Sequence, residues 1–377
     1  MKHINFLIKP ASSACNLRCR YCFYEDESVN RSVKNMGLMS PKTVKLLLTS
    51  AYEAAEPGGS IHFAFQGGEP TVAGLPFFMN FVSQARKLCP PSVHISFAIQ
   101  TNGTLLDQKW TEFFRQEDFL VGISLDGFKD VHNLYRVDSF GSSTWNRVTK
   151  AVNLLQKNSV KVNALCVVTA QFARSPIKAY NELKKLGFDF MQFIACLDPI
   201  GKEKGSMPYS LTPELYGNFL CKLFDLWYED WNNGNYHSVR LFEDYIQILL
   251  SSASSTCATC GRCGSYFVVE GDGSLYPCDF YAIDNWKIGN LGEASLSALA
   301  ESSKAKEFLQ FGAEKPRECY ECRYGTICHG GCKNDWIEGI NGPHNYFCSS
   351  FKTLLDYAMP RMQFMARKEA SARRQNS

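Results

Sequence analysis

A cysteine-rich run near the start of the chain decides the fold: Cys15-Asn16-Leu17-Arg18-Cys19-Arg20-Tyr21-Cys22. It directly follows Asn5–Ile8, a short apolar stretch that predicts a buried β-strand. Three thiolates in one tight loop can bind three irons of a four-iron cubane and leave the fourth iron open. An open position is typical of a catalytic metal site, whereas structural zinc prefers four protein ligands. Zinc is the alternative, although no fourth cysteine lies beside this run.

Strand-like and helix-like segments alternate over roughly the first 200 residues, as in a parallel sheet with helical crossovers. The predicted strands are Asn5–Ile8, Ile61–Phe65, Ile95–Gln100, Val121–Leu125, Val162–Val168 and Phe190–Ala195. Amphipathic stretches predict helices at Lys42–Ala54, Pro76–Lys87, Gln108–Gln116, Thr144–Gln156 and Ser175–Leu186. These units predict an α/β fold, either an open doubly wound sheet or a partial barrel.

Polar or glycine-rich motifs follow four of the predicted strands. They are Gln66-Gly67-Gly68-Glu69-Pro70, Gln100-Thr101-Asn102-Gly103, Ser124 with Asp126-Gly127, and Cys196-Leu197-Asp198-Pro199. Ligands of parallel sheets bind at the carboxyl ends of the strands, so these motifs together predict one site. Ordinary turns could explain any single motif, but they do not easily explain all four.

The pattern changes in the second half of the chain. Leu211–Trp231, Val239–Leu250 and Ser350–Ala366 predict helices, and Phe267–Tyr276 predicts a hairpin with an Asp-Gly turn. We therefore expect two domains, residues 1–235 and residues 236–377.

The composition narrows the class of protein. The chain has 377 residues, a formal net charge of +3 and 16 cysteines. So small a charge gives no reason to expect a nucleic-acid partner, and no apolar stretch reaches the ~18 residues of a membrane span. Disulfides are disfavoured in a reducing cytosol, so many cysteines in a long chain indicate metal binding or redox chemistry. We expect a soluble, cytoplasmic protein.

The cysteine run, with its aromatic Tyr21 before the third cysteine, resembles the radical S-adenosylmethionine superfamily. The resemblance implies that Cys15, Cys19 and Cys22 hold a [4Fe–4S] cluster. Its open iron would chelate S-adenosylmethionine, the source of a 5′-deoxyadenosyl radical.

Further cofactor contacts follow from the same resemblance: Tyr21, Gly68, Ser124, Arg136 and Leu197. Gly67-Gly68-Glu69-Pro70 resembles the segment that binds the methionine amine. There, glycine lets backbone carbonyls approach and a carboxylate can neutralise the charge. Arg136 suits the cofactor carboxylate because a guanidinium is permanently charged and fork-shaped. A surface salt bridge is the alternative for Arg136.

A longer cysteine pattern resembles the SPASM domain of peptide- and protein-modifying enzymes. Its members are Cys257, Cys263, Cys278, Cys319, Cys322, Cys328, Cys332 and Cys348. The resemblance assigns Cys257, Cys263, Cys278 and Cys332 to a nearer auxiliary cluster, and Cys319, Cys322, Cys328 and Cys348 to a farther one. The implied total is three [4Fe–4S] clusters. Full ligation of the two auxiliary clusters favours electron transfer over substrate binding.

Some assignments in this region stay open. Cys260 lies midway between Cys257 and Cys263 and could replace either by spacing, although the family pattern argues against it. Cys319-x2-Cys322 is also a zinc spacing. By resemblance Asp279 is the general base; a turn-capping aspartate is the alternative.

Segments along nearly the whole chain are similar to anaerobic sulfatase-maturating enzymes. They are Leu7–Ser13, Tyr21–Tyr24, Phe65–Thr71, Cys196–Pro199, Leu226–Asp230 and Tyr276–Tyr281. The resemblance implies a partial (β/α)6 TIM-like barrel followed by a cysteine-rich SPASM domain that binds two auxiliary clusters. It also implies oxidation of a cysteine or serine in a sulfatase signature to Cα-formylglycine.

In the implied mechanism the first cluster reduces S-adenosylmethionine, and the adenosyl radical removes a Cβ hydrogen from the target residue. Asp279 accepts the thiol or hydroxyl proton, and the auxiliary clusters accept the second electron. For cysteine, the resulting thioaldehyde hydrolyses to the aldehyde. Tyr24 and Gln66 would line the target pocket.

The implied partners are an unfolded or nascent sulfatase segment and an electron donor such as ferredoxin or flavodoxin; we expect a monomer. Two other functions remain open. One is a related radical enzyme that modifies another peptide, for example by a thioether crosslink. The other is a non-enzymatic zinc-binding adaptor. Cysteine or serine preference, the partner sulfatase and the reductant are not predicted.

Overall fold

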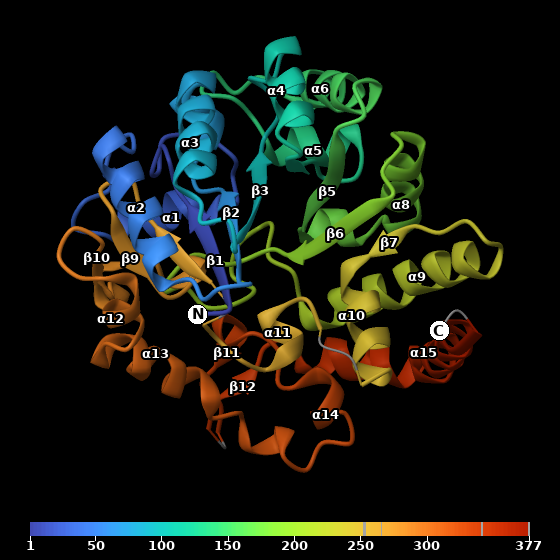
Figure 1. The fold of residues 1–377 in the computed structure, drawn as a ribbon. Helices are drawn as coiled ribbons and strands as arrows, with labels where there is room; N and C mark the ends of the chain where they lie inside the picture. Colours follow the sequence, from blue (N-terminus) through green and yellow to red (C-terminus); the bar gives the residue numbers. More distant parts are fainter. Residues whose placement is uncertain (252–253, 265, 341, 376–377) are drawn as a thin grey trace. The chain divides into compact units, whose positions relative to one another are not determined.

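The computed structural model describes residues 1–251, 254–264, 266–340 and 342–375 (Figure 1). They form two compact units. The first comprises Met1–Leu125, His132–Asn163 and Gly264–Gln310, and the second Asp126–Val131, Ala164–Cys263 and Phe311–Ser377. Each unit is therefore assembled from separate stretches of the chain. The division at residue 235 stays a prediction.

The first unit is built on four parallel strands in the order β1-β2-β3-β4. Their bounds are β1 His3–Ile8, β2 Ser60–Phe65, β3 His94–Thr101 and β4 Leu120–Ser124, as predicted to within two residues. Ile8 pairs with Phe65, and Phe65 with Ile99. This register aligns the carboxyl ends of the strands, where the polar motifs follow.

A row of phenylalanine side chains holds these strands together. Phe6, Phe63, Phe97 and Phe119 stack in sequence, with ring centroids 5.8, 5.9 and 5.3 Å apart. All four are buried. Offset stacking of buried rings adds to the free energy gained from apolar burial.

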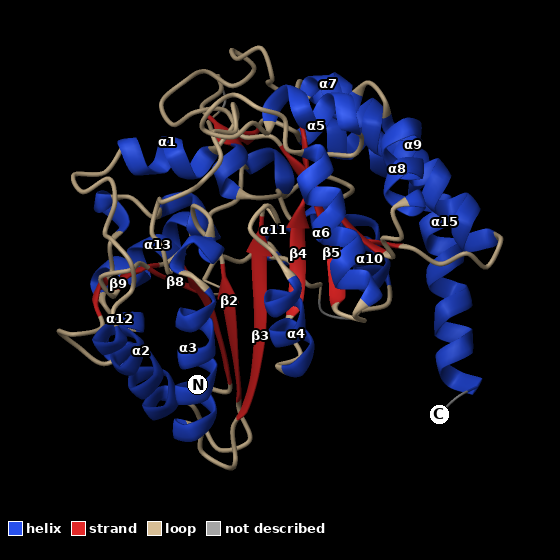
Figure 2. Ribbon diagram, turned by 90° about the horizontal axis from the view of Figure 1, so that it is seen from above, coloured by secondary structure: helices blue, strands red, loops and turns tan. Residues whose placement is uncertain are grey.

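Helices flank the strands of this unit (Figure 2). They include α1 Phe23–Val29, α2 Pro41–Ala54, α3 Leu75–Leu88, α4 Gln108–Gln116, α6 Trp145–Lys157 and α12 Leu296–Ala300. Helix α2 begins one residue before its predicted start at Lys42, because Ser40 accepts a hydrogen bond from Thr43 N and proline follows at the first helical position. Helices α1 and α12 were not predicted.

A hairpin from late in the chain extends the same sheet. Strand β8, Phe267–Val269, pairs parallel with β1, and β9, Ser274–Tyr276, pairs antiparallel with β8 (Figure 1). A short β10, Gly289–Asn290, pairs with β9. The hairpin was predicted, but its pairing with β1 was not. This pairing brings residues 278 and 279 into the unit that carries the first cysteine run.

The second unit contains the parallel strands β6 Phe190–Ala195 and β7 Ser238–Val239, with most of β5, Lys161–Val168. Its helices include α8 Pro176–Lys185, α9 Pro213–Asn232, α10 Arg240–Leu249, α11 Cys257–Cys260, α14 Gly325–Cys328 and α15 Cys348–Gln375. Helix α15 continues through Pro360 and extends beyond its predicted end at Ala366.

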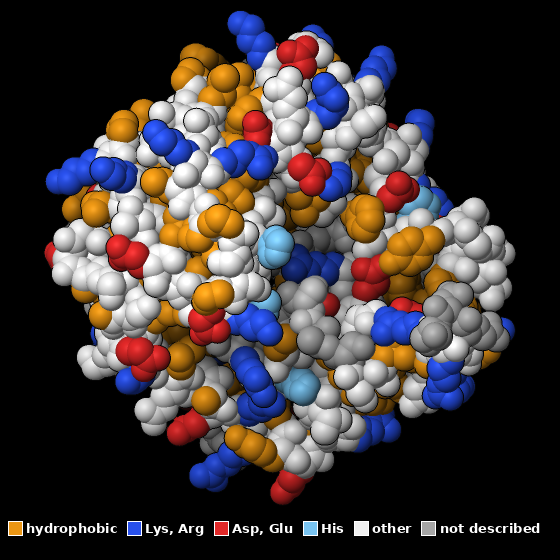
Figure 3. Space-filling view, in the orientation of Figure 1, with side chains coloured by type: hydrophobic (Ala, Val, Ile, Leu, Met, Phe, Trp, Pro, Cys, Tyr) orange, Lys and Arg blue, Asp and Glu red, His pale blue; other side chains and the backbone are white. Residues whose placement is uncertain are grey.

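Charged side chains of both signs are interspersed on the face drawn in Figure 3. This mixture agrees with the small net charge of +3. Among the described residues, no helix is both long and apolar enough to cross a membrane.

Candidate active site

The first cysteine run forms the loop between β1 and α1, and Cys22 is the N-cap residue of α1. The loop is tight: Cys22 N donates to Cys19 O over 3.1 Å, and Leu17 N donates to Cys15 Sγ over 3.3 Å. All three thiols are partly buried. Burial raises the pKa of Cys15 to about 11 and also raises the pKa of Cys22. Bound iron would favour the thiolates, because a coordinating metal deprotonates its thiol ligands.

The segment around Arg136 holds this loop in place. Arg18 N donates to Val137 O over 2.7 Å, and Arg20 N donates to Tyr135 O over 3.0 Å. The Arg136 guanidinium lies 5.4 Å from the centre of the Tyr21 ring. Arg136 is only 7% exposed, so the surface salt bridge considered for it is wrong.

The glycine motif after β2 crosses the beginning of the cysteine loop at very short range. Gly68 N donates to Ser12 O over 3.0 Å, and Glu69 N donates to Ala14 O over 2.8 Å. A Cβ atom added to Gly68 would lie 2.3 Å from Ala14 O, a backbone atom. Position 68 therefore requires glycine for packing alone, whatever ligand its carbonyl meets.

The Glu69 side chain connects the segment after β2 to the end of β3 through hydrogen bonds. Its buried carboxylate accepts hydrogen bonds from Thr71 N (3.0 Å) and Thr71 Oγ1 (2.6 Å). It also accepts bonds from Thr101 Oγ1 and Asn102 N, both over 2.7 Å. Burial raises the pKa of Glu69, and these bonds oppose that shift. Its negative charge can still attract an ammonium, but its oxygens already serve four protein donors.

A ring of amide and hydroxyl groups ties the cysteine loop to the end of β3. Asn102 Nδ2 donates to Asn16 Oδ1 over 2.9 Å, and Asn16 Nδ2 donates to Thr104 Oγ1 over 2.8 Å. Thr104 Oγ1 donates to Asn102 Oδ1 over 2.7 Å. Asn16 and Thr104 were not predicted as site residues, since nothing in the sequence indicates that they meet.

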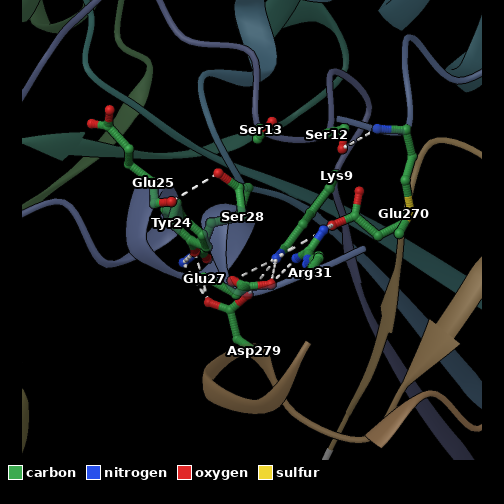
Figure 4. A network of polar contacts seen from close by, with 12 residues as sticks. Lys9, Ser12, Ser13, Tyr24, Glu25, Glu27, Ser28, Arg31, Glu270 and Asp279 are labelled. Atoms are coloured by element: carbon green, nitrogen blue, oxygen red, sulfur yellow. Dashed lines mark hydrogen bonds and ion pairs between the residues drawn. The ribbon is translucent and has the colours of Figure 1, made fainter. Parts of the chain in front are cut away.

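Asp279 lies beside Tyr24 (Figure 4), and its Oδ2 atom lies 3.4 Å from Gln66 Nε2. Tyr24 and Gln66 are the two residues expected to line the target pocket. Tyr24 OH donates to Asp279 Oδ2 over 2.7 Å and accepts a hydrogen bond from Gln66 Nε2. Burial and the nearby carboxylate raise the pKa of Tyr24 far above its ordinary value, so its hydroxyl stays a donor.

The other carboxylate oxygen of Asp279 is open. Oδ1 is buried and has no hydrogen-bond partner among the described residues, and the whole residue is 4% exposed. Burial raises the pKa of Asp279, and Lys9 and Tyr24 oppose that shift. The turn-capping alternative for Asp279 is wrong, because its carboxylate bonds to side chains from distant parts of the chain.

A buried ion network surrounds Asp279 (Figure 4). Lys9 Nζ lies 2.8 Å from Glu27 Oε1, and 3.6 Å from both Glu270 Oε1 and Asp279 Oδ1. Arg31 pairs with both Glu27 and Glu270. Each of these side chains is at most 5% exposed. The network joins β1 and α1 to the hairpin segment, and it was not predicted from the sequence.

Two cavities in the second unit are lined by the predicted auxiliary-cluster cysteines. Cys319, Cys322, Cys328 and Cys348 line one of them. Cys257, Cys263 and Cys332 line the other. Cys260 lines neither; it is exposed, and its sulfur lies 2.9 Å from Ser254 Oγ.

In the part of the chain that the structure describes, the cysteine side chains do not converge on positions where a single metal ion could bind. Among the described residues, no three His, Cys, Asp or Glu side chains converge closely enough to bind one metal ion. The thiolate ligands of a cubane bind different irons, so a cluster does not require such convergence. Four cysteines around one cavity therefore fit a fully ligated cluster.

The remaining predicted site residues occupy three strand-end positions. Ser124 is the last residue of β4 and is buried. Leu197 is partly buried in the loop after β6, in the second unit. Cys278 lies in the first unit, with its sulfur 3.6 Å from Tyr266 OH.

The parallel sheet with its cysteine loop defines the class of protein. Residues 10–171 match the Radical SAM superfamily, and residues 257–323 match SPASM, described as an iron-sulfur cluster-binding domain. Members of this class use S-adenosylmethionine and iron–sulfur clusters, so the cofactor prediction is supported at that level.

More narrowly, the chain belongs to the anaerobic sulfatase-maturating enzymes. It is 44% identical over 364 residues to a cysteine-type enzyme of Clostridium perfringens, covering 96% of this chain and 98% of the relative. A serine-type enzyme of Klebsiella aerogenes is 33% identical, over 87% of this chain and 79% of the relative. The solved structure of native anSMEcpe with bound AdoMet and Cp18Cys peptide matches with a TM-score of 0.92 and 42% identity. That match covers 97% of this chain and 99% of the other.

Proposed function

We propose that this enzyme oxidises a cysteine side chain in a sulfatase polypeptide to Cα-formylglycine. The observation that carries the proposal is the buried Asp279 carboxylate, with Oδ2 bonded to Tyr24 and Oδ1 open. The carboxylate belongs to the same unit as a loop of three cysteines suited to a radical-generating cluster. Family membership supplies the reaction type.

We assign Cys15, Cys19 and Cys22 to the cluster that binds S-adenosylmethionine, with cofactor contacts from Tyr21, Gly68, Ser124, Arg136 and Leu197. The auxiliary clusters would be held by Cys257, Cys263, Cys278 and Cys332, and by Cys319, Cys322, Cys328 and Cys348. Support comes from the cavities that seven of these eight cysteines line. Clusters there would supply an electron acceptor.

The role of Asp279 follows from the balance of the reaction. Conversion of the cysteine side chain to a thioaldehyde removes a hydrogen atom from carbon, a proton from sulfur and one electron. When bound, the first cluster and S-adenosylmethionine supply the radical that takes the hydrogen atom. Asp279 Oδ1 accepts the thiol proton, because it is a buried acceptor that makes no hydrogen bond within the described residues, and its nearest cation, Lys9 Nζ, lies 3.6 Å away. Hydrolysis of the thioaldehyde then releases hydrogen sulfide and leaves the aldehyde.

Cysteine is the proposed target because the cysteine-type relative is 44% identical and the serine-type relative 33% identical. A thiol also loses its proton more readily than a hydroxyl does. The substrate would be an unfolded or nascent segment, so that the target residue can enter a buried site.

The proposal includes the setting in which the enzyme works. A low-potential electron donor such as ferredoxin or flavodoxin would reduce the first cluster. Many free thiols require a reducing compartment, which favours the cytoplasm. We propose a monomer.

The test is anaerobic incubation of the reconstituted enzyme with dithionite, S-adenosylmethionine and a sulfatase-signature peptide whose cysteine carries deuterium at Cβ. We expect mass spectrometry to find formylglycine in the peptide and deuterium in 5′-deoxyadenosine. A matched peptide with serine at the target position should react more slowly.

A peptide with alanine at the target position is the control and should remain unmodified. An unchanged cysteine peptide, or one that carries a thioether crosslink, would contradict the proposed function. A colourless protein with zinc and no sulfide after anaerobic purification would contradict the whole class of reaction.

A further inference from the structure

Lys9 is the buried cation next to Asp279, and it does not reach the surface. Its side chain is 2% exposed. The ammonium donates to both carboxylate oxygens of Glu27, over 2.8 and 3.0 Å. It also lies 3.6 Å from Asp279 Oδ1 and 5.0 Å from the centre of the Tyr24 ring. Lys9 therefore contacts both members of the hydrogen-bonded pair Tyr24–Asp279.

The ammonium itself has little freedom to move. Glu27 is fixed by Arg31, which bonds Glu270 Oε1 over 2.6 Å from its other side. The Lys9 stem packs against the glycine motif, since a Cβ atom on Gly67 would lie 2.9 Å from Lys9 Cγ. Charge, hydrogen bonds and packing thus hold Lys9 Nζ at one position.

We propose that Lys9 is a positioning residue that directs Oδ1 of Asp279 toward the substrate thiol. Tyr24 holds Oδ2 and the ammonium attracts Oδ1, so the two contacts together define the plane of the carboxylate. The inference rests on the proposed function, because it concerns the acceptor of the substrate proton. Displacement of a reacting group by about 1 Å can lower a rate by about 100-fold.

The buried ion network around Asp279 is suited to positioning the Asp279 carboxylate, and not only to stabilising the fold. Two cations, Lys9 and Arg31, face three carboxylates, those of Glu27, Glu270 and Asp279. Buried ion networks often contribute little net stability, whereas loss of one partner is costly. Lys9 makes its ion pair with Asp279 while Arg31 keeps Glu27 and Glu270 in place.

The test is Lys9→Met, which keeps the length of the stem and removes the charge. We expect kcat for formylglycine to fall about 10- to 100-fold, as for other residues that orient a catalytic ligand. The KM for the peptide and the yield of 5′-deoxyadenosine should stay at the wild-type values. Lys161→Met, which removes a surface pair with Asp118, is the control and should behave like wild type.

A second variant separates positioning from charge balance. Lys9→Met/Glu270→Gln removes one positive and one negative charge, so the net charge of the network is unchanged. If Lys9 positions Asp279, this variant retains iron and sulfide but still forms little formylglycine per 5′-deoxyadenosine. Recovery of wild-type product by this variant would overturn the proposal, and so would loss of the clusters from both variants.

A double-mutant cycle supplies the decisive readout. If Lys9 acts through Asp279, Lys9→Met should have no further effect in an Asp279→Asn background. An equal loss in both backgrounds would show a separate role and overturn the inference. Failure of the proposed function would look different, because the wild-type enzyme itself would then form no formylglycine.

Discussion

The hydroxyl of Tyr24 donates a 2.7 Å hydrogen bond to Oδ2 of Asp279, a residue 255 positions further along the chain. Tyr24 belongs to the helix that follows the first cysteine run, and Asp279 directly follows Cys278. This one bond connects a segment beside the proposed radical cluster to a segment beside a proposed auxiliary-cluster ligand.

Asp279→Asn should retain cleavage of S-adenosylmethionine and lose formylglycine formation by about 100- to 10,000-fold, because the amide cannot accept the thiol proton. Quantifying 5′-deoxyadenosine and modified peptide in the same reaction checks this. Asp118→Asn, which removes a surface charge paired with Lys161, is the control and should change neither quantity. Full product formation by Asp279→Asn would remove Asp279 from the mechanism.

Tyr24→Phe should lower kcat for formylglycine less than Asp279→Asn does, by about tenfold. It removes the bond to Oδ2, but Gln66 Nε2 lies 3.4 Å from the same oxygen and can partly replace the lost donor. Tyr24→Phe/Gln66→Leu removes both donors and should be slower than either single variant. Steady-state kinetics would contradict this account if Tyr24→Phe, Gln66→Leu and the double variant had equal kcat values.

Glu69→Gln should weaken the unit that carries the cysteine loop. Glutamine keeps one oxygen, which can still accept from Thr71 and Thr101, but its amide nitrogen at the Oε2 position cannot accept the hydrogen bond that Asn102 N donates. An unsatisfied buried donor costs about 1–3 kcal/mol, so the holoenzyme should melt at a lower temperature and bind S-adenosylmethionine more weakly. Glu117→Gln, which breaks a partly exposed pair with Arg86, should change stability by less than about 1 kcal/mol.

Gly68→Ala should reduce the iron content after reconstitution, since its Cβ would lie 2.3 Å from Ala14 O and displace the cysteine loop. Gly58→Ala is the matched control. Gly58 has φ of +74° and open space around it, so alanine there introduces backbone strain but no collision. Equal iron content in Gly68→Ala and wild type would show that the loop can move aside.

Cys260→Ala should retain all iron and activity, whereas Cys263→Ala should lose one cluster's share of the iron. Cys263 lines the cavity shared with Cys257 and Cys332, and Cys260 is exposed outside it. The iron and sulfide contents of the two variants would be compared after anaerobic purification. The opposite result would assign Cys260 as the ligand in place of Cys263.

Much of the fold was predictable, because short apolar runs and amphipathic stretches in the sequence indicate strands and helices locally. The six strands from β1 to β6 appear where short apolar runs predicted them, and α4 spans its predicted residues, Gln108–Gln116. The end of α15 and the existence of α1 were not predictable in this way. Helix α1 is a short segment, FYEDESV, without a clear apolar stripe, and it is stabilised by the tertiary contacts of Glu27.

The amino-acid sequence by itself determined that the first loop can hold three irons of a cluster, because three cysteines lie within it, and the resemblance to a known family implied the reaction class. The same resemblance implied that Asp279, beside Cys278, is the general base. Only the tertiary structure decided that the hairpin of β8 and β9 joins β1, and that Lys9, Glu27, Arg31 and Glu270 gather around Asp279. Pairing between strands far apart in sequence and burial of charges depend on the whole fold, so no local pattern records them.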